Sequence, residues 1–203
     1  MERIQLASGD ITQLEVDIIV NAANSSLLGG GGVDGAIHRA AGSELREYCS
    51  TLGGCQTGEA KITPGFALKA SHIIHTVGPV WRGGEQNEAE QLATCYRACL
   101  ELAAENQASS IAFPAISTGA YGFPSDLAAK IAIREVNKWL EQNNLPQTVT
   151  FVYFNAHTEA AYQKAMCDYK ERQTDKICHC ILFSAIISSK LQIISRCPEC
   201  CSD

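Results

Sequence analysis

The chain has 203 residues, of which 46% are hydrophobic and 19% charged, and its formal net charge is −6. This length allows one domain with a core of its own, so neither disulfides nor a structural metal is needed for folding. The acidic balance argues against a protein that holds duplex nucleic acid by neutralising phosphates, or one that lies on an anionic membrane. No basic-then-apolar leader precedes the first strand-like run, so we expect a cytoplasmic protein whose ten cysteines are reduced thiols.

Strand-like and helix-like segments alternate along most of the chain. In chain order, the sequence predicts strand Ile4–Ala7, strand Asp17–Ala22, helix Val33–Ser50, strands Ala60–Thr63 and His72–Val77, a helix through Leu92–Ala103, strand Ser110–Pro114, a helix after Pro124, strand Thr148–Asn155 and helix His157–Gln173. Alternation of this kind implies an α/β fold with a mainly parallel sheet covered by helices on both faces.

The composition changes near Gln173–Thr174. All 16 glycines precede Met166, whereas five of the ten cysteines lie in the last thirty residues. We therefore expect one domain over residues 1–173 and a Cys-rich C-terminal extension over 174–203 that is unstructured or atypical. Two groups in the extension have ligand-like spacings for tetrahedral zinc, Cys178-His179-Cys180 and Cys197-Pro198-Glu199-Cys200-Cys201. The first is C-x-C, not the usual C-x₂-C, so an extension without metal is the preferred interpretation.

Two glycine-rich segments follow predicted strands, where ligands bind in sheets of this kind. After Asn21–Asn24 come four consecutive glycines, Gly29–Gly32, and then a helix; Ala115–Gly122 likewise leads into a helix. Glycine lets backbone N–H groups approach a ligand, and a helix N-terminus adds partial positive charge. We therefore expect a cradle for an anion, most naturally a pyrophosphate, that is built from backbone dipoles. Among the cysteines of the domain, Cys55 in its own glycine-rich turn is the one we expect to be exposed.

Other interpretations of these glycines fit less well. Gly30–Gly35 matches G-x-G-x-x-G, but it begins about seven residues after the strand, and no acid lies near Thr51–Cys55 to bind a ribose. Ala115 occupies the first glycine position of a G-x-S-x-G motif around Ser117, which disfavours a serine-hydrolase elbow. Tight turns alone do not require four glycines in a row.

Several motifs stand in a fixed order along the chain: Gly9–Thr12, Asn21–Asn24, Gly29–Gly42, His75–Pro79, Val77–Gly84 and Pro114–Gly122. Together they resemble macro domains, and most closely the bacterial O-acetyl-ADP-ribose deacetylases of the MacroD type, over about residues 3–172. The resemblance implies a three-layer α/β/α sandwich with a mixed, mainly parallel central sheet. It also implies that the ligands are ADP-ribose and its acylated derivatives, with no metal or organic cofactor.

The resemblance implies roles for the binding residues. Asp10 would accept a hydrogen bond from the adenine amino group beside the backbone N–H of Ile11, which selects adenine over guanine. Phe154 would pack on the adenine face. From the sequence alone, Asp10 equally suits a turn cap, and a core position is the commoner use of an aromatic such as Phe154. The pyrophosphate and the distal ribose would be wrapped by Ser117, Thr118, Gly119, Ala120 and Tyr121, with Gly32 and Val33 closing the other side.

Catalysis would rest on Asn24 and Asp34. The Asn24 amide would fix a ribose hydroxyl, and Asp34 would accept a proton from water or from a ribose hydroxyl. Asp34 also suits a helix start, where interaction with the helix dipole contributes only about 0.3–1 kcal/mol. His38 lies four residues later on the same helix face and could orient Asp34, but such a histidine is more often structural and is not assigned to the site.

Three functions follow from the resemblance. Having both Asn24 and Asp34 favours a hydrolase that deacetylates O-acetyl-ADP-ribose, with removal of mono-ADP-ribose from acidic side chains as a related activity. The alternatives are a reader that binds ADP-ribose without cleaving anything, and a protein-binding regulator of ribonuclease III, because some similar proteins are described in that way. Neither direct nucleic-acid binding nor a membrane partner is expected.

Overall fold

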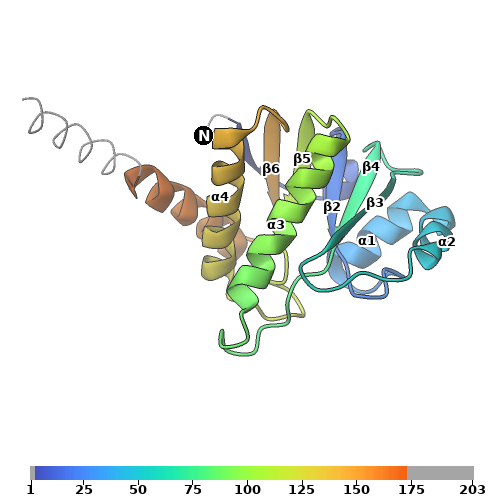
Figure 1. Ribbon diagram of the computed structural model, residues 1–203, viewed down its shortest axis with the longest axis horizontal. Coiled ribbons are helices and arrows are strands. Elements are labelled where there is room, and N and C mark those ends of the chain that lie inside the picture. The colour runs from blue at the N-terminus through green and yellow to red at the C-terminus, as the bar shows by residue number, and fades with distance from the viewer. Residues whose placement is uncertain (1–2, 173–203) are drawn as a thin grey trace, which may run out of the picture. The chain divides into compact units, whose positions relative to one another are not determined.

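The computed structural model describes residues 3–172, in which six strands form one sheet (Figure 1). The strands are β1 (Ile4–Ser8), β2 (Ile18–Ala22), β3 (Ala60–Pro64), β4 (His72–Thr76), β5 (Ser110–Pro114) and β6 (Thr148–Tyr153). Their order is β1-β6-β5-β2-β4-β3, and every neighbouring pair is parallel except β3–β4. This mixed, mainly parallel sheet confirms the expected fold class.

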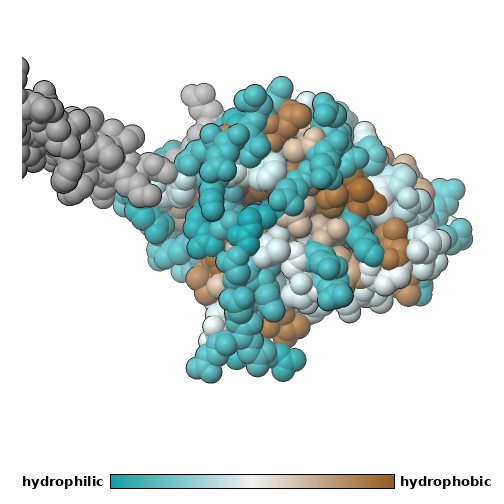
Figure 2. All heavy atoms as spheres, in the orientation of Figure 1, coloured by the Kyte–Doolittle hydropathy of each residue, from teal (hydrophilic) through white to brown (hydrophobic). Residues whose placement is uncertain are grey.

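The helices come from the segments between the strands. They are the 3-10 helix η1 (Ile11–Gln13), α1 (Gly32–Ala41), α2 (Ser43–Thr51), α3 (Glu88–Glu105), α4 (Ser125–Gln142) and a helix over residues 156–172. In Figure 1, α3 and α4 lie side by side across one face of the sheet. Figure 2 shows that this side of the molecule is largely hydrophilic, with hydrophobic residues in separate patches.

The core lies on both faces of the sheet, because neighbouring residues of a strand point to opposite sides. On one side Ala112 of β5 packs with Ile19 and Ile73 against the buried residues of α1 and α2. On the other side Phe113 lies 5.2 Å from Tyr96 of α3, measured between ring centroids. Burial on both faces explains the almost wholly apolar strands and holds the ends of β2 and β5 rigidly in place.

The predicted helix Val33–Ser50 is wrong in one respect, because the structure divides it into α1 and α2. Gly42 separates them with φ of 91°, and its N–H donates to the His38 carbonyl at 3.2 Å. A positive φ costs glycine little, and it ends the α-helical hydrogen-bond pattern. The apolar spacing continues across Gly42, so periodicity did not reveal the break.

Two expectations about cysteines have different outcomes. Cys55 is buried, with 6% of its surface exposed, so the expectation that it is exposed is wrong. The Cys-rich extension and its zinc-like spacings lie outside the described residues. Within residues 3–172, no helix is long and apolar enough to cross a bilayer.

Candidate active site

A cavity of about 400 Å³ lies at the carboxyl ends of β2, β5 and β6. Its wall comes from the loop between β2 and α1, the loop after β5, and the residues that follow β6. Pockets of about 300–1,000 Å³ are typical for small ligands. All the predicted site residues line this cavity except Asp10 and Ile11; those that line it are Asn24, Gly32, Val33, Asp34, Ser117, Thr118, Gly119, Ala120, Tyr121 and Phe154.

Backbone groups form the part of the wall where an anion was expected. Gly30–Gly32 leads into α1, whose N-cap Gly31 makes no side-chain capping hydrogen bond. Amide N–H groups of a first helical turn have no partner within the helix, so they can bind an anion. Among the described residues, no lysine or arginine lines the cavity. A phosphate placed here would meet backbone groups and no basic side chain.

The loop after β5 holds Ser117 in an unusual state. Its φ is 65°, a region that L-residues rarely adopt, and the Phe123 N–H donates to its carbonyl at 3.0 Å. The Ser117 hydroxyl is buried and has no hydrogen-bond partner. A non-glycine residue in this region costs about 1–3 kcal/mol and persists only where the surroundings impose it. Backbone strain of this kind clusters at ligand sites, and Ser117 lines the cavity.

Asp34 lies in the first turn of α1, and its carboxylate is buried on the cavity wall. Its Oδ1 accepts a hydrogen bond from Asn21 Nδ2 at 2.8 Å, and its Oδ2 lies 3.4 Å from Asn24 Nδ2. His38 Nε2 lies 3.5 Å from Oδ1. Burial raises the pKa of Asp34, and the Asn21 hydrogen bond and the nearby His38 oppose that rise in pKa. A buried carboxylate with a raised pKa is a stronger proton acceptor than an exposed one.

A chain of buried hydrogen bonds extends behind Asp34, and sequence reasoning missed it. Asn21 Nδ2 also donates to His75 Nδ1 at 3.0 Å, so the ring proton is on Nε2, which lies 3.1 Å from Thr63 Oγ1. Burial, and then the nearby His38, lowers the pKa of His75 to about 3, so the ring is neutral. Because these hydrogen bonds orient the Asn21 amide, its N–H group points to Asp34 and helps to keep the Asp34 carboxylate ionised.

The sequence does contain a signal for this series of buried hydrogen bonds. Asn21 is the one polar residue of β2, His75 is a buried polar residue of β4, and the sheet pairs them in register. A buried polar side chain needs a partner. The partner was not apparent from the sequence, because nothing local shows that β2 and β4 are neighbours.

Asn24 forms hydrogen bonds within its own loop. Its Nδ2 donates to the Gly29 carbonyl at 2.9 Å, and its Oδ1 accepts from Ser26 N at 3.0 Å. The side chain thus shapes the loop that leads to α1, and its amide also reaches towards Asp34. Its predicted contact with a ribose hydroxyl stays a prediction.

Asp10 and Ile11 lie beside the cavity, at the end of β1. The Gly9 N–H donates to the Tyr153 carbonyl at 3.1 Å, which brings this segment next to Phe154. Asp10 Oδ1 accepts from Thr12 N at 2.9 Å and so caps η1. Phe154 lines the cavity with 63% of its surface exposed, so its interpretation as a core aromatic is wrong.

Comparisons with known proteins agree with this geometry. Residues 20–132 match the family model described as Macro domain. The chain is 59% identical over 166 residues to a macro domain-containing protein of Methanosarcina mazei, covering 82% of this chain and 89% of that protein. It is 55% identical over 168 residues to a Salmonella gallinarum protein named O-acetyl-ADP-ribose deacetylase, covering 81% and 94%.

A solved structure is also similar. The Trypanosoma brucei macrodomain in complex with ADP-ribose superposes with a TM-score of 0.75 at 46% identity. The match covers 81% of this chain and 69% of the trypanosome chain. The similarity therefore extends over the sheet and both cavity loops.

Proposed function

The chain belongs to the macro domain family, and from this we propose that it is an ADP-ribose-binding hydrolase that deacetylates O-acetyl-ADP-ribose. The observation that carries the proposal is the buried Asp34 carboxylate, held by amide donors on the wall of a ligand-sized cavity. The name of the Salmonella relative and the ADP-ribose complex of the trypanosome macrodomain support it.

Each part of ADP-ribose can be matched to one region of the cavity. The pyrophosphate fits the backbone cradle of Gly30–Gly32 and Ser117–Tyr121. The exposed ring of Phe154 offers a stacking surface for adenine. The distal ribose then lies towards Asn24 and Asp34, where the ester is to be cleaved.

Asp34 supplies the chemistry by general-base catalysis. Its carboxylate takes a proton from a water molecule, whose oxygen attacks the acetyl carbonyl carbon. Collapse of the tetrahedral intermediate breaks the ester bond, the ribose oxygen takes the proton that Asp34 accepted from water, and the acetic acid released ionises to acetate. A base in this position typically contributes about 10²–10⁴-fold in rate. An ester between ribose and a protein Asp or Glu side chain has the same bond, so its hydrolysis belongs to the same proposal.

The decisive experiment is mass spectrometry of O-acetyl-ADP-ribose incubated with the purified chain, which should yield ADP-ribose and acetate. A protein carrying an ADP-ribosylated glutamate serves as the second substrate. Tight binding of ADP-ribose without release of product from either substrate would establish a non-catalytic reader. Regulation of ribonuclease III, also implied by the resemblance, stays a prediction.

Binding of ADP-ribose should depend only weakly on salt. The cradle uses backbone groups, so the affinity should change by less than about tenfold between about 50 and 200 mM salt. Proteins that neutralise 6–10 phosphates with basic side chains lose about 10³–10⁵ in affinity over that range. Calorimetry in a salt series measures the slope. A steep slope, or tight binding of duplex RNA, would contradict a backbone cradle.

Asp10→Ala separates two roles of this carboxylate. If Asp10 binds adenine, ADP-ribose affinity should fall by about 1.5–3 kcal/mol, the range for a hydrogen bond to a charged group. If it only caps η1, the free energy of unfolding should fall by about 0.5–2 kcal/mol while affinity is unchanged. Calorimetry together with chemical denaturation distinguishes the two, and unchanged affinity refutes the adenine assignment.

A further inference from the structure

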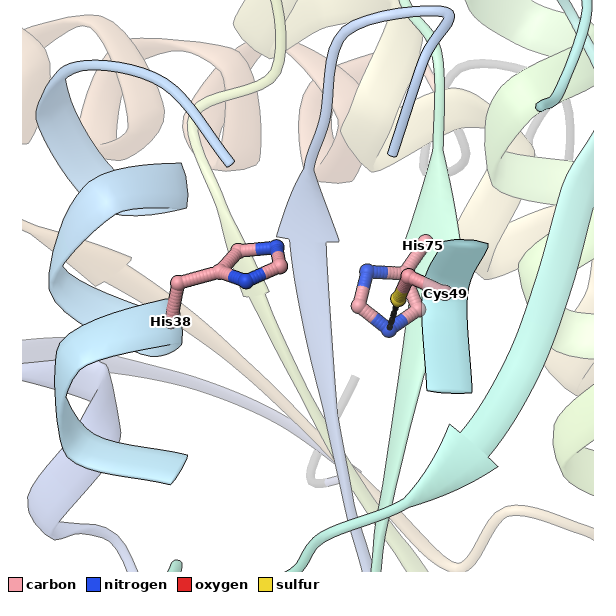
Figure 3. A group of neighbouring side chains, drawn as sticks. All are labelled: His38, Cys49 and His75. Atoms are coloured by element: carbon pink, nitrogen blue, oxygen red, sulfur yellow. Dashed lines mark hydrogen bonds between the residues drawn. The ribbon is translucent and has the colours of Figure 1, made fainter. Parts of the chain in front are cut away.

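Three potential metal ligands meet behind Asp34, on the side of this residue away from the backbone cradle. Figure 3 shows the His38 ring of α1 facing His75 of β4, with the Cys49 sulfur of α2 beside them. One ligand atom from each side chain lies within 4.8 Å of the other two, and Cys49 Sγ is 4.0 Å from His75 Nε2. The three side chains come from three different elements, so they are placed by the fold and not by a local sequence motif.

The donors suit a thiophilic cation. Two imidazoles and a thiolate are typical ligands of Zn²⁺ and not of Mg²⁺ or Ca²⁺. His38 Nε2 is buried and makes no hydrogen bond, although Asp34 Oδ1 lies 3.5 Å away. This ring nitrogen is therefore available to a metal ion.

The distances between the three ligand atoms permit an ion to bind between them. An ion among three atoms at such separations lies within about 2.8 Å of each, and Zn–N and Zn–S bonds of about 2.0–2.3 Å need shifts of about 0.5–0.8 Å. Side-chain rotation supplies movements of that size. His75 then exchanges its hydrogen bond with Thr63 for the metal.

The Asp34 carboxylate stands next to this group of three ligands. Asp34 Oδ1 is 3.5 Å from His38 Nε2. Its negative charge attracts a cation and, together with the Cys49 thiolate, balances a divalent charge, which a buried site requires.

We propose that His38, Cys49 and His75 bind a divalent cation of the Zn²⁺ class next to the Asp34 carboxylate, and that binding inhibits the hydrolase. The metal-site part stands on the geometry alone, whereas the inhibition rests on the proposed function. On binding, the Cys49 proton leaves to solvent and the S–metal bond forms, so one proton is released for each ion. No electron is transferred.

Asn21 couples the metal to Asp34. A metal on His75 Nε2 moves the ring proton to Nδ1, where a hydrogen-bond acceptor is then needed. Asn21 Oδ1 is buried and has no partner, and a half-turn of the amide presents it to that proton. The same half-turn removes the amide donor from Asp34 Oδ1. Metal binding thus weakens the proposed base, because the nearby cation attracts the Asp34 carboxylate and the carboxylate loses its hydrogen bond from Asn21.

Cobalt binding tests the site directly, in the full chain with the cysteines of the extension replaced by serine. These are Cys178, Cys180, Cys197, Cys200 and Cys201. One equivalent of Co²⁺ should produce a thiolate-to-cobalt charge-transfer band and release one proton. Cys49→Ser should abolish the band and weaken Zn²⁺ affinity by at least about tenfold, measured against a chromophoric chelator. Cys55→Ser is the matched control, since this thiol is also buried with a pKa raised to about 11, and it should leave both unchanged.

His38→Gln provides a second variant in case Cys49→Ser does not fold, which circular dichroism would show. It should weaken Zn²⁺ affinity by about as much while the thiolate stays available. A charge-transfer band that survives in Cys49→Ser, or Zn²⁺ affinity that is the same in His38→Gln and the parent, would overturn the site.

Deacetylation assays test the coupling. Zn²⁺ should inhibit the parent and Cys55→Ser by at least about tenfold, because the general base is weakened by the nearby cation and by the loss of its hydrogen bond. Cys49→Ser should keep the metal-free rate and lose the inhibition. Cobalt binding without inhibition by Zn²⁺ would overturn the link to Asp34. A chain that binds cobalt as expected but never deacetylates would refute the proposed function and leave the metal site in place.

Discussion

Replacing Asp34 by alanine should lower the rate of O-acetyl-ADP-ribose deacetylation by about 10²–10⁴-fold and change ADP-ribose affinity little. The substitution removes the proposed base and leaves the backbone cradle and the Phe154 ring in place. Product release followed by mass spectrometry gives the rate, and calorimetry gives the affinity. Equal rates in the two proteins would exclude Asp34 as the base. Loss of affinity together with rate would show that Asp34 shapes the loop.

Asn24→Ala should differ from Asp34→Ala in its effect on ADP-ribose affinity. Because the Asn24 amide holds Gly29 and Ser26 within the loop, its removal should lower both affinity and rate. A loss of rate alone would assign Asn24 to the transition state only.

The dependence of the deacetylation rate on pH should reflect the ionisation of the Asp34 carboxylate. Burial raises the pKa of Asp34 from its usual 3.8, so activity should fall on acidification through a pKa higher than that of an ordinary aspartate. The effect of pH on the free energy of unfolding has the opposite sign to its effect on activity. Since the folded-state pKa exceeds the unfolded one, the stabilising contribution of Asp34 is complete below the unfolded pKa and is lost as pH rises through the folded pKa. Asp34→Ala should remove the acid limb of the kcat profile.

Gly35→Ala should destabilise the protein by about 1–3 kcal/mol, because the added methyl group overpacks a closed contact. Helix propensity predicts the opposite, a gain of about 0.8–1 kcal/mol for alanine inside α1. The steric effect dominates, since the new Cβ would stand 2.4 Å from the Gly30 carbonyl oxygen, a backbone atom. Displacing Gly30 also disturbs the loop before Asp34, so deacetylation should fall as well. Chemical denaturation and the deacetylation assay measure the two effects.

Gly119→Ala is the matched control, because its Cβ would meet no protein atom within 4 Å. Its free energy of unfolding should change by less than about 0.5 kcal/mol. A Gly35→Ala variant as stable as the parent would show that α1 moves away from the loop without cost.

Most of the architecture followed from local sequence patterns. Buried strands such as Ser110–Pro114 were found because both faces are apolar and turn residues mark their ends. The division of Val33–Ser50 at Gly42 was missed, because a glycine inside a helical pattern does not reveal its own φ. Tertiary packing, and not the spacing of side chains, determines that angle.

The site was predictable as far as it is local. Asp34 and the glycine loops stood in recognisable motifs, and all of them line one cavity. Asn21 and His75 stood in the quoted motifs, but their hydrogen bond to each other was missed, because it comes from strand pairing that no local pattern specifies. The resemblance placed Phe154 in the site, whereas its residue type alone suggested the core, since exposure depends on where β6 ends.

The backbone cradle has a consequence for drug resistance. Every residue type except proline carries the N–H group on which Gly30–Gly32 and Ser117–Tyr121 rely, so exchanging a side chain cannot delete the contact. A methyl group added at Gly31 or Gly119 meets no protein atom and affects only what occupies the cavity. Bulk there would exclude the natural ligand together with a competitive inhibitor. A compound that mimics the pyrophosphate would therefore leave few single substitutions that escape it and still preserve binding of the natural ligand.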